Sequence, residues 1–174
     1  MRYRLKWAPL LIIPLLLCSP LPVAAQQEAD LLEMSVKGVV VDPTSGAPLV
    51  VLQDGQGQQL LPIAIGTNEA QSISMEMARV TPVRPMTYDL ITKILARLEA
   101  KVSRVVINDV KDSIVYARLY LKLAKGELVI DARPSDAINI ALRNKAHIFV
   151  AKKVRDTMII DALPQEKGKD RLTL

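Results

Sequence analysis

Apolar residues follow two different spacings along this chain, and each spacing predicts a different kind of element. Leu32, Met34 and Val36 alternate with polar residues, and a valine run then reaches Val41, which is typical of a strand. Alternation, or short apolar runs between turn residues, predicts further strands at 48–53, 59–65, 102–110, 114–123, 127–130 and 147–150. Turn residues at 111–113 predict a hairpin between the two longest of these.

Helical spacing appears in three segments. Residues 69–79 place Ala70, Ile73 and Met77 on one face, and a helix at 135–144 has an apolar inner face. The helix after Thr87 carries the longest apolar stripe: Leu90, Ile91, Ile94, Leu95 and Leu98. Strand runs interspersed with helices indicate an α+β fold, a mixed and mostly antiparallel sheet flanked by about three helices. We expect one domain over residues 26–160.

The first 25 residues have the features of a secretory signal peptide. Basic residues precede an apolar run, and Val23-Ala24-Ala25 supplies the small residues that a signal peptidase requires. Prolines interrupt the run, so a membrane anchor is not expected, and no membrane span remains after cleavage. We therefore predict a periplasmic or secreted protein, with a mobile charged tail at 161–174.

Charge and cysteine content narrow the functional classes. Cleavage removes three basic residues, so the formal net charge falls from +5 to +2, which gives little support to nucleic-acid binding through bulk electrostatics. The single cysteine, Cys18, lies in the signal, which excludes thiolate metal sites from the remainder. The basic run 152–155 is interpreted as a solvated face.

Two predicted helix starts have similar sets of residues. Arg84-Pro85-Met86-Thr87-Tyr88-Asp89 and Arg133-Pro134-Ser135-Asp136 each combine an arginine, a proline, a hydroxyl residue and an aspartate. Thr87 and Ser135 are the expected caps, and an aspartate suits the positive end of a helix dipole. If the two starts converge in space, they form a pocket with two arginines and several carboxylates.

The candidate site consists of carboxylates and arginines. Asp89, Asp131 and Asp136 are the candidate catalytic residues and metal ligands, and Glu69 supports them. Carboxylate oxygens suit Mg²⁺ or Ca²⁺, and the guanidinium groups of Arg84 and Arg133 match phosphate oxygens in two-point geometry. The chemistry indicated is phosphodiester recognition or cleavage. The alternative is structural, since ion pairs such as Arg133 with Asp136 tie strand exits to helix starts equally well.

The order of the motifs resembles the bifunctional nuclease domain family. The resemblance covers roughly residues 34–155 and is carried by four segments, Leu61-Pro62-Ile63-Ala64-Ile65-Gly66, Arg84-Pro85-Met86-Thr87-Tyr88-Asp89-Leu90, Asp131-Ala132-Arg133-Pro134-Ser135-Asp136-Ala137 and Ile148-Phe149-Val150, together with Glu69-Ala70. It implies a mixed β-sheet with flanking helices, assembly as dimers, and RNase and DNase activity of the kind reported for plant members.

Two residues depart from the family pattern. Ala64 stands where the family usually has tryptophan, and Tyr88 stands where it usually has histidine. The second change removes the imidazole nearest the carboxylates, so activity that needs a histidine base is impaired. Two functions therefore stay open: a secreted or periplasmic metal-assisted nuclease acting on RNA or DNA, and a non-catalytic binding or assembly module braced by the arginine and aspartate cluster.

Overall fold

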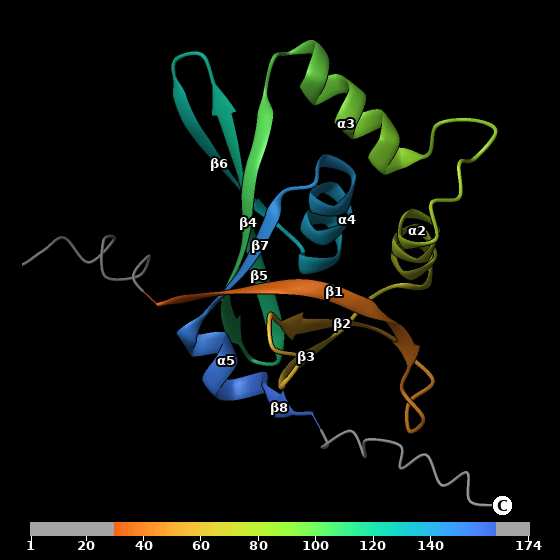
Figure 1. Ribbon diagram of the computed structural model, residues 1–174, viewed down its shortest axis with the longest axis vertical. Coiled ribbons are helices and arrows are strands. Elements are labelled where there is room, and N and C mark those ends of the chain that lie inside the picture. Colours follow the sequence, from red (N-terminus) through yellow and green to blue (C-terminus); the bar gives the residue numbers. More distant parts are fainter. Residues whose placement is uncertain (1–29, 163–174) are drawn as a thin grey trace, which may run out of the picture.

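The computed structural model describes residues 30–162, which form one sheet and four helices (Figure 1). The signal peptide predicted at 1–25 and tail residues 163–174 lie outside the described residues. The elements are β1 (Leu31–Val41), β2 (Pro48–Asp54), β3 (Gln59–Ala64), α2 (Thr67–Met77), α3 (Thr87–Arg97), β4 (Lys101–Lys111), β5 (Ile114–Leu123), β6 (Gly126–Ala132), α4 (Pro134–Asn144), β7 (His147–Ala151), α5 (Lys152–Met158) and β8 (Ile160–Asp161). The predicted α+β class is confirmed.

The sheet joins two antiparallel meanders through one central strand. Its order is β6-β5-β4-β7-β1-β2-β3-β8, and β7 pairs antiparallel with β1 but parallel with β4. Local turns explain each meander, since antiparallel neighbours need only a hairpin. The parallel β4–β7 pair instead needs a crossover, which is formed by β5, β6 and α4. At the sheet edge, β8 pairs Asp161 with Gln59, so Asp161, which was predicted to begin the charged tail, belongs to the sheet.

Helices cover both faces of the sheet at β4. Val105, Val106 and Ile107 are all almost fully buried, and because successive strand residues point to opposite faces, both faces must be covered. α4 packs on β4, β5 and β7, and α5 packs on β3, β4 and β7. The predicted helix at 135–144 is confirmed as α4, and its buried alanines, Ala137 and Ala141, let it approach the sheet closely.

The apolar stripe of α3 is not buried as its spacing suggests. Ile91 and Leu95 pack against the core, whereas Leu90, Ile94 and Leu98 are 54%, 48% and 68% exposed. The reason is topological: α3 packs on α4 and lies above it, away from the sheet (Figure 1). Likewise, the predicted helix at 69–79 is α2, which buries Ala70 and Ile73 and leaves Met77 exposed.

α5 was not predicted from the sequence. Its basic run forms a helix, and Val154 lies fully buried among exposed lysines. Nζ of Lys153 lies 2.5 Å from Oδ1 of Asp109 on β4. With seven residues, the helix is too short for its amphipathic period to be recognised. Within residues 30–162, no helix is long and apolar enough to cross a membrane.

Candidate functional site

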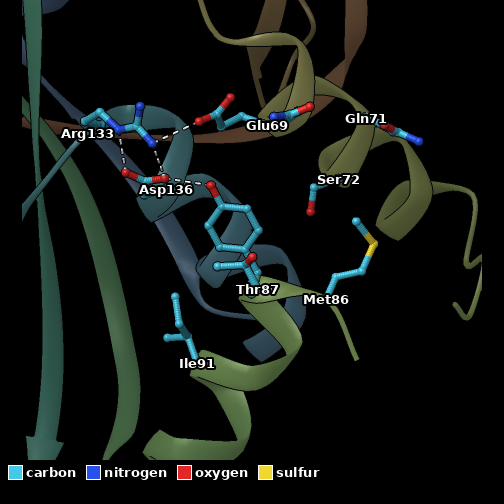
Figure 2. Close-up of a pocket in the computed structure, with 10 residues that line it drawn as sticks. Glu69, Gln71, Ser72, Met86, Thr87, Ile91, Arg133 and Asp136 are labelled. Carbon is cyan, nitrogen blue, oxygen red and sulfur yellow. Dashed lines mark hydrogen bonds and ion pairs between the residues drawn. The ribbon is translucent and has the colours of Figure 1, made fainter. Parts of the chain in front are cut away.

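A pocket, which we name the main pocket because it holds most of the motif residues, lies where α2, α3 and α4 begin (Figure 2). Its volume is about 650 Å³. It is lined by Asn68, Glu69, Gln71, Ser72, Met86, Thr87, Tyr88, Ile91, Arg133 and Asp136. The two helix starts of the sequence motifs therefore do converge, and α2 completes the pocket.

Arg133 is the central cation of the pocket. Its Nε donates to Oδ2 of Asp136 at 2.7 Å, and its Nη2 donates to Oδ1 of Asp136 and to Oε1 of Glu69, each at 2.9 Å. Figure 2 shows the guanidinium between the two carboxylates. Hydrogen bonds with Asp136, and then with Glu69, raise the pKa of Arg133 further above its already high ordinary value. The group is permanently charged, and its side chain is 66% exposed.

Tyr88 contributes a buried hydroxyl to the same carboxylate. Its hydroxyl donates to Oδ1 of Asp136 at 2.6 Å. Burial, followed by the hydrogen bond to Asp136, raises the pKa of Tyr88 well above its ordinary value, so the hydroxyl stays protonated. Burial alone would raise the pKa of Asp136, but hydrogen bonds from Arg133 and Tyr88 lower it below its usual range. Asp136 is therefore an anion that holds a proton weakly.

The backbone at the start of α4 fixes this arrangement. Arg133 occupies the N-cap in extended conformation, Pro134 begins the helix, and Asp136 lies in the first turn. The prediction that Ser135 and Thr87 cap their helices is wrong. The N-caps are Arg133 and Met86, and neither makes a side-chain cap. Proline at the first helical position shifts the cap to the residue before it.

Asp89 does not face the pocket. Its Oδ2 accepts a hydrogen bond of 2.9 Å from the Met86 backbone N–H, and its Oδ1 accepts one of 2.8 Å from Nε of Arg143. The hydrogen bond from Arg143, and then that from Met86, lower the pKa of Asp89. Asp89 thus fixes the start of α3 and joins it to α4.

Arg143 is a residue of the site that was not predicted from the sequence. Its side chain is 7% exposed, donates to Ser72 Oγ at 3.0 Å, and lies 5.5 Å from the ring centre of Tyr88. The available signal was spacing: residues 136, 139 and 143 follow i, i+3 and i+7, so Asp136, Asn139 and Arg143 share one helix face. This polar face links all three helices behind the pocket.

Two further predicted residues lie elsewhere. Asp131 is exposed on β6, opposite Arg118 of β5, and Arg84 is exposed in the loop before α3. Neither lines the pocket. The expected pocket with two arginines therefore contains one, because the residues before Pro85 lead away from α3, whereas Arg133 directly precedes α4.

The carboxylates do not form a metal-type cluster. Among residues 30–162, no group of three or more histidine, cysteine, aspartate or glutamate side chains is placed to hold a metal ion. Glu69 and Asp136 share the guanidinium of Arg133, which already occupies the position between them. The geometry therefore does not fit the ligand set Asp89, Asp131 and Asp136, and a divalent cation stays a prediction from the sequence.

The described residues thus form a mixed sheet with an arginine and carboxylate pocket where three helices begin. The bifunctional nuclease domain model matches residues 50–162, most of the chain. An uncharacterized protein of Mycobacterium tuberculosis is 36% identical over 122 residues, 70% of this chain and 73% of that protein. The chain belongs to the bifunctional nuclease domain family.

Plant relatives share a smaller part of their length. Bifunctional nuclease 1 of Oryza sativa subsp. indica is 31% identical over 111 residues, 62% of this chain and 33% of the plant protein. Bifunctional nuclease 2 of Arabidopsis thaliana is 33% identical over 109 residues, 61% of this chain and again 33% of the plant protein. The match therefore covers about a third of each plant protein.

Proposed function

We propose that the pocket binds a phosphodiester of RNA or DNA at Arg133 and hydrolyses it. The observation that carries this proposal is the exposed guanidinium of Arg133, held in place by two carboxylates at the wall of a 650 Å³ pocket. A guanidinium oriented in advance loses little entropy when it binds phosphate. Membership of a nuclease-named family supports the same chemistry.

One edge of the guanidinium is available to substrate. Nε and Nη2 are bonded to Asp136 and Glu69, while Nη1 forms no hydrogen bond with residues 30–162. A phosphate oxygen accepts from Nη1 in this geometry, and the positive charge offsets the charge that develops on the phosphoryl oxygens in the transition state. Arg133 therefore binds substrate while Asp136 keeps it in position.

Glu69 is the better placed of the two carboxylates to act as the base. Among residues 30–162 it accepts side-chain hydrogen bonds through Oε1 alone, which leaves a lone pair of Oε2 for a water proton. Asp136 accepts from both Arg133 and Tyr88, and its lowered pKa makes it a weak base. In the proposed step, the water oxygen attacks phosphorus, its proton passes to Glu69, and the bond to the leaving oxygen breaks as that oxygen gains a proton from solvent.

A second function is favoured by how fully the charges of the cluster are paired with one another. The charges of Arg133, Glu69 and Asp136 are satisfied by one another, which is also the arrangement of an internal brace between α2 and α4. In that case the domain is a non-catalytic binding or assembly module. Dimer formation and a periplasmic or secreted location remain predictions from the sequence, and in such a location scavenged nucleic acid is the available substrate.

The deciding experiment is hydrolysis of labelled single-stranded RNA and DNA with Mg²⁺, Mn²⁺, Ca²⁺ or EDTA. We expect cleavage that falls by about 100-fold or more in Glu69→Gln, as for loss of a general base, and also in Arg133→Met. Asp131→Asn is the matched control, since Asp131 lies outside the pocket, and it should retain activity. EDTA decides whether a metal takes part.

Thermal melting of the same variants separates the two functions. If the cluster is only a brace, the wild type shows background hydrolysis in every condition, and Arg133→Met lowers the melting temperature because Glu69 and Asp136 lose their common partner. If the nuclease proposal is right, Glu69→Gln loses activity while it still unfolds cooperatively.

A further inference from the structure

A second hollow lies directly beside the main pocket. It has a volume of about 460 Å³ and forms where the end of β3, the β4–β5 turn, the start of α4 and the end of α5 meet. Its apolar walls are Ile63, Ala64, Ile65, Ile114, Val115 and Met158. Arg133 lines both hollows, so the two share this residue. We call this second hollow the apolar groove.

The groove has an uneven distribution of charge. Among the described residues that line it, Arg133 is the one charged side chain, and Ser113 and Ser135 add hydroxyl groups. An occupant that matches these walls has one anionic end, at Arg133, and an uncharged, largely apolar body with few polar groups. The charge and polarity of the groove therefore limit which group can be attached to the bound phosphate.

We propose that the apolar groove is a nucleoside subsite, which holds the base next to the phosphate bound by Arg133. This inference rests on the proposed function, since it places the rest of that substrate. A nucleobase is an uncharged, flat group with apolar faces and polar edges, joined to a phosphate through its sugar. Its faces match the aliphatic walls, its edges match the hydroxyl groups of Ser113 and Ser135, and its phosphate matches Arg133. Burial of its faces against aliphatic side chains adds affinity that phosphate alone lacks.

Two residues control access to the groove. Ala64 is exposed at the end of β3 and lines the groove with a single methyl group, which leaves the space open. Ile114 is 57% exposed and follows the tight β4–β5 turn, in which Asp112 and Ser113 have positive φ angles of 48° and 64°. A large side chain at position 64 would fill the groove without entering the core.

The test compares probes that share a phosphate and differ in the attached group. Isothermal titration calorimetry with adenosine monophosphate, ribose phosphate and hexyl phosphate measures how much binding affinity the base adds. We expect the wild type to bind the nucleotide about tenfold more tightly than ribose phosphate. In Ala64→Trp this advantage should disappear while ribose phosphate binds unchanged. Ala64→Ser is the control that keeps the groove open, and Ile114→Ser should reduce the advantage only partly.

The possible failures can be told apart. If no phosphate probe binds in a way that Arg133→Met abolishes, the proposed function itself is wrong. If phosphate binds at Arg133 but the nucleotide has no advantage, or keeps it in Ala64→Trp, only the nucleoside subsite is overturned. Tighter binding of hexyl phosphate than of the nucleotide would likewise overturn the subsite, because the groove would then select an alkyl chain. Melting curves confirm that each variant is folded.

Discussion

Oδ1 of Asp89 accepts a hydrogen bond of 2.8 Å from Nε of Arg143, although 54 residues separate the two in the sequence. The Arg143 side chain is 7% exposed and also donates to Ser72 on α2. One side chain of α4 thus holds both α2 and α3 against it. The pocket is formed by the first turns of these three helices, so its geometry depends on this link behind it.

Loss of Arg143 should therefore destabilise the domain. Arg143→Met removes the shared partner of Asp89 and Ser72, and we expect the free energy of unfolding to fall by about 3 kcal/mol, as for a buried ion pair that loses one member. Urea denaturation followed by circular dichroism measures this change. Arg97→Met, on the exposed end of α3, is the matched control and should stay within about 0.5 kcal/mol of wild type. Equal effects of the two substitutions would contradict the role of Arg143.

Acid should weaken the same link. Arg143 and the Met86 N–H lower the folded-state pKa of Asp89. The contribution of Asp89 to the free energy of unfolding is therefore fully present above the unfolded pKa of about 3.9. It is lost as the pH falls through the folded-state pKa. We expect the wild type to lose stability below about pH 5. Asp89→Asn should be less stable at neutral pH and should lose less on acidification. Denaturation at a series of pH values provides the check, and parallel curves would argue against it.

The hydroxyl of Tyr88 can be removed without its ring. In Tyr88→Phe, Asp136 loses a hydrogen bond of 2.6 Å, while the aromatic packing beside Arg143 is kept. We expect a loss of about 2 kcal/mol, because the acceptor is charged. The pKa of Asp136 should also rise, since the Tyr88 hydroxyl is one of the groups that lower it. Carbon NMR titration of the Asp136 carboxyl reports this directly, and an unchanged pKa would show that Arg133 alone sets it.

Gly66 leaves the space that the Glu69 carboxylate occupies. A Cβ at Gly66 would overlap Oε2 of Glu69, and the backbone there has φ of −74°, which alanine adopts without strain. Gly66→Ala should therefore displace the carboxylate from Arg133 at little cost to stability. If Glu69 is the base, hydrolysis should fall by about 10- to 100-fold. In the control Gly38→Ala, the added Cβ meets nothing within 4 Å, and full activity is expected.

Local pattern was enough to predict most of the elements. Hairpin turns and alternating residues gave the two meanders, and helical spacing gave α2, α3 and α4, because these signals arise between residues close in sequence. The seven-residue α5 was missed, and the buried stripe expected on α3 was wrong. Whether a helix face is covered depends on the elements that pack above it, and spacing along the chain does not contain that information.

By itself, the sequence determined that Arg133 and Asp136 lie at the start of one helix, since Pro134 fixes that start, although it left Asp131 as another possible partner of Arg133. It also determined the α+β class. Only the tertiary structure decided the other members of the cluster: Glu69 joins Arg133 from α2, while Asp89, from the similar motif at the start of α3, pairs with Arg143 instead. The physical reason is that a carboxylate pairs with the cation that packing brings nearest, and the packing of α2 and α3 on α4 decides which cation each carboxylate meets.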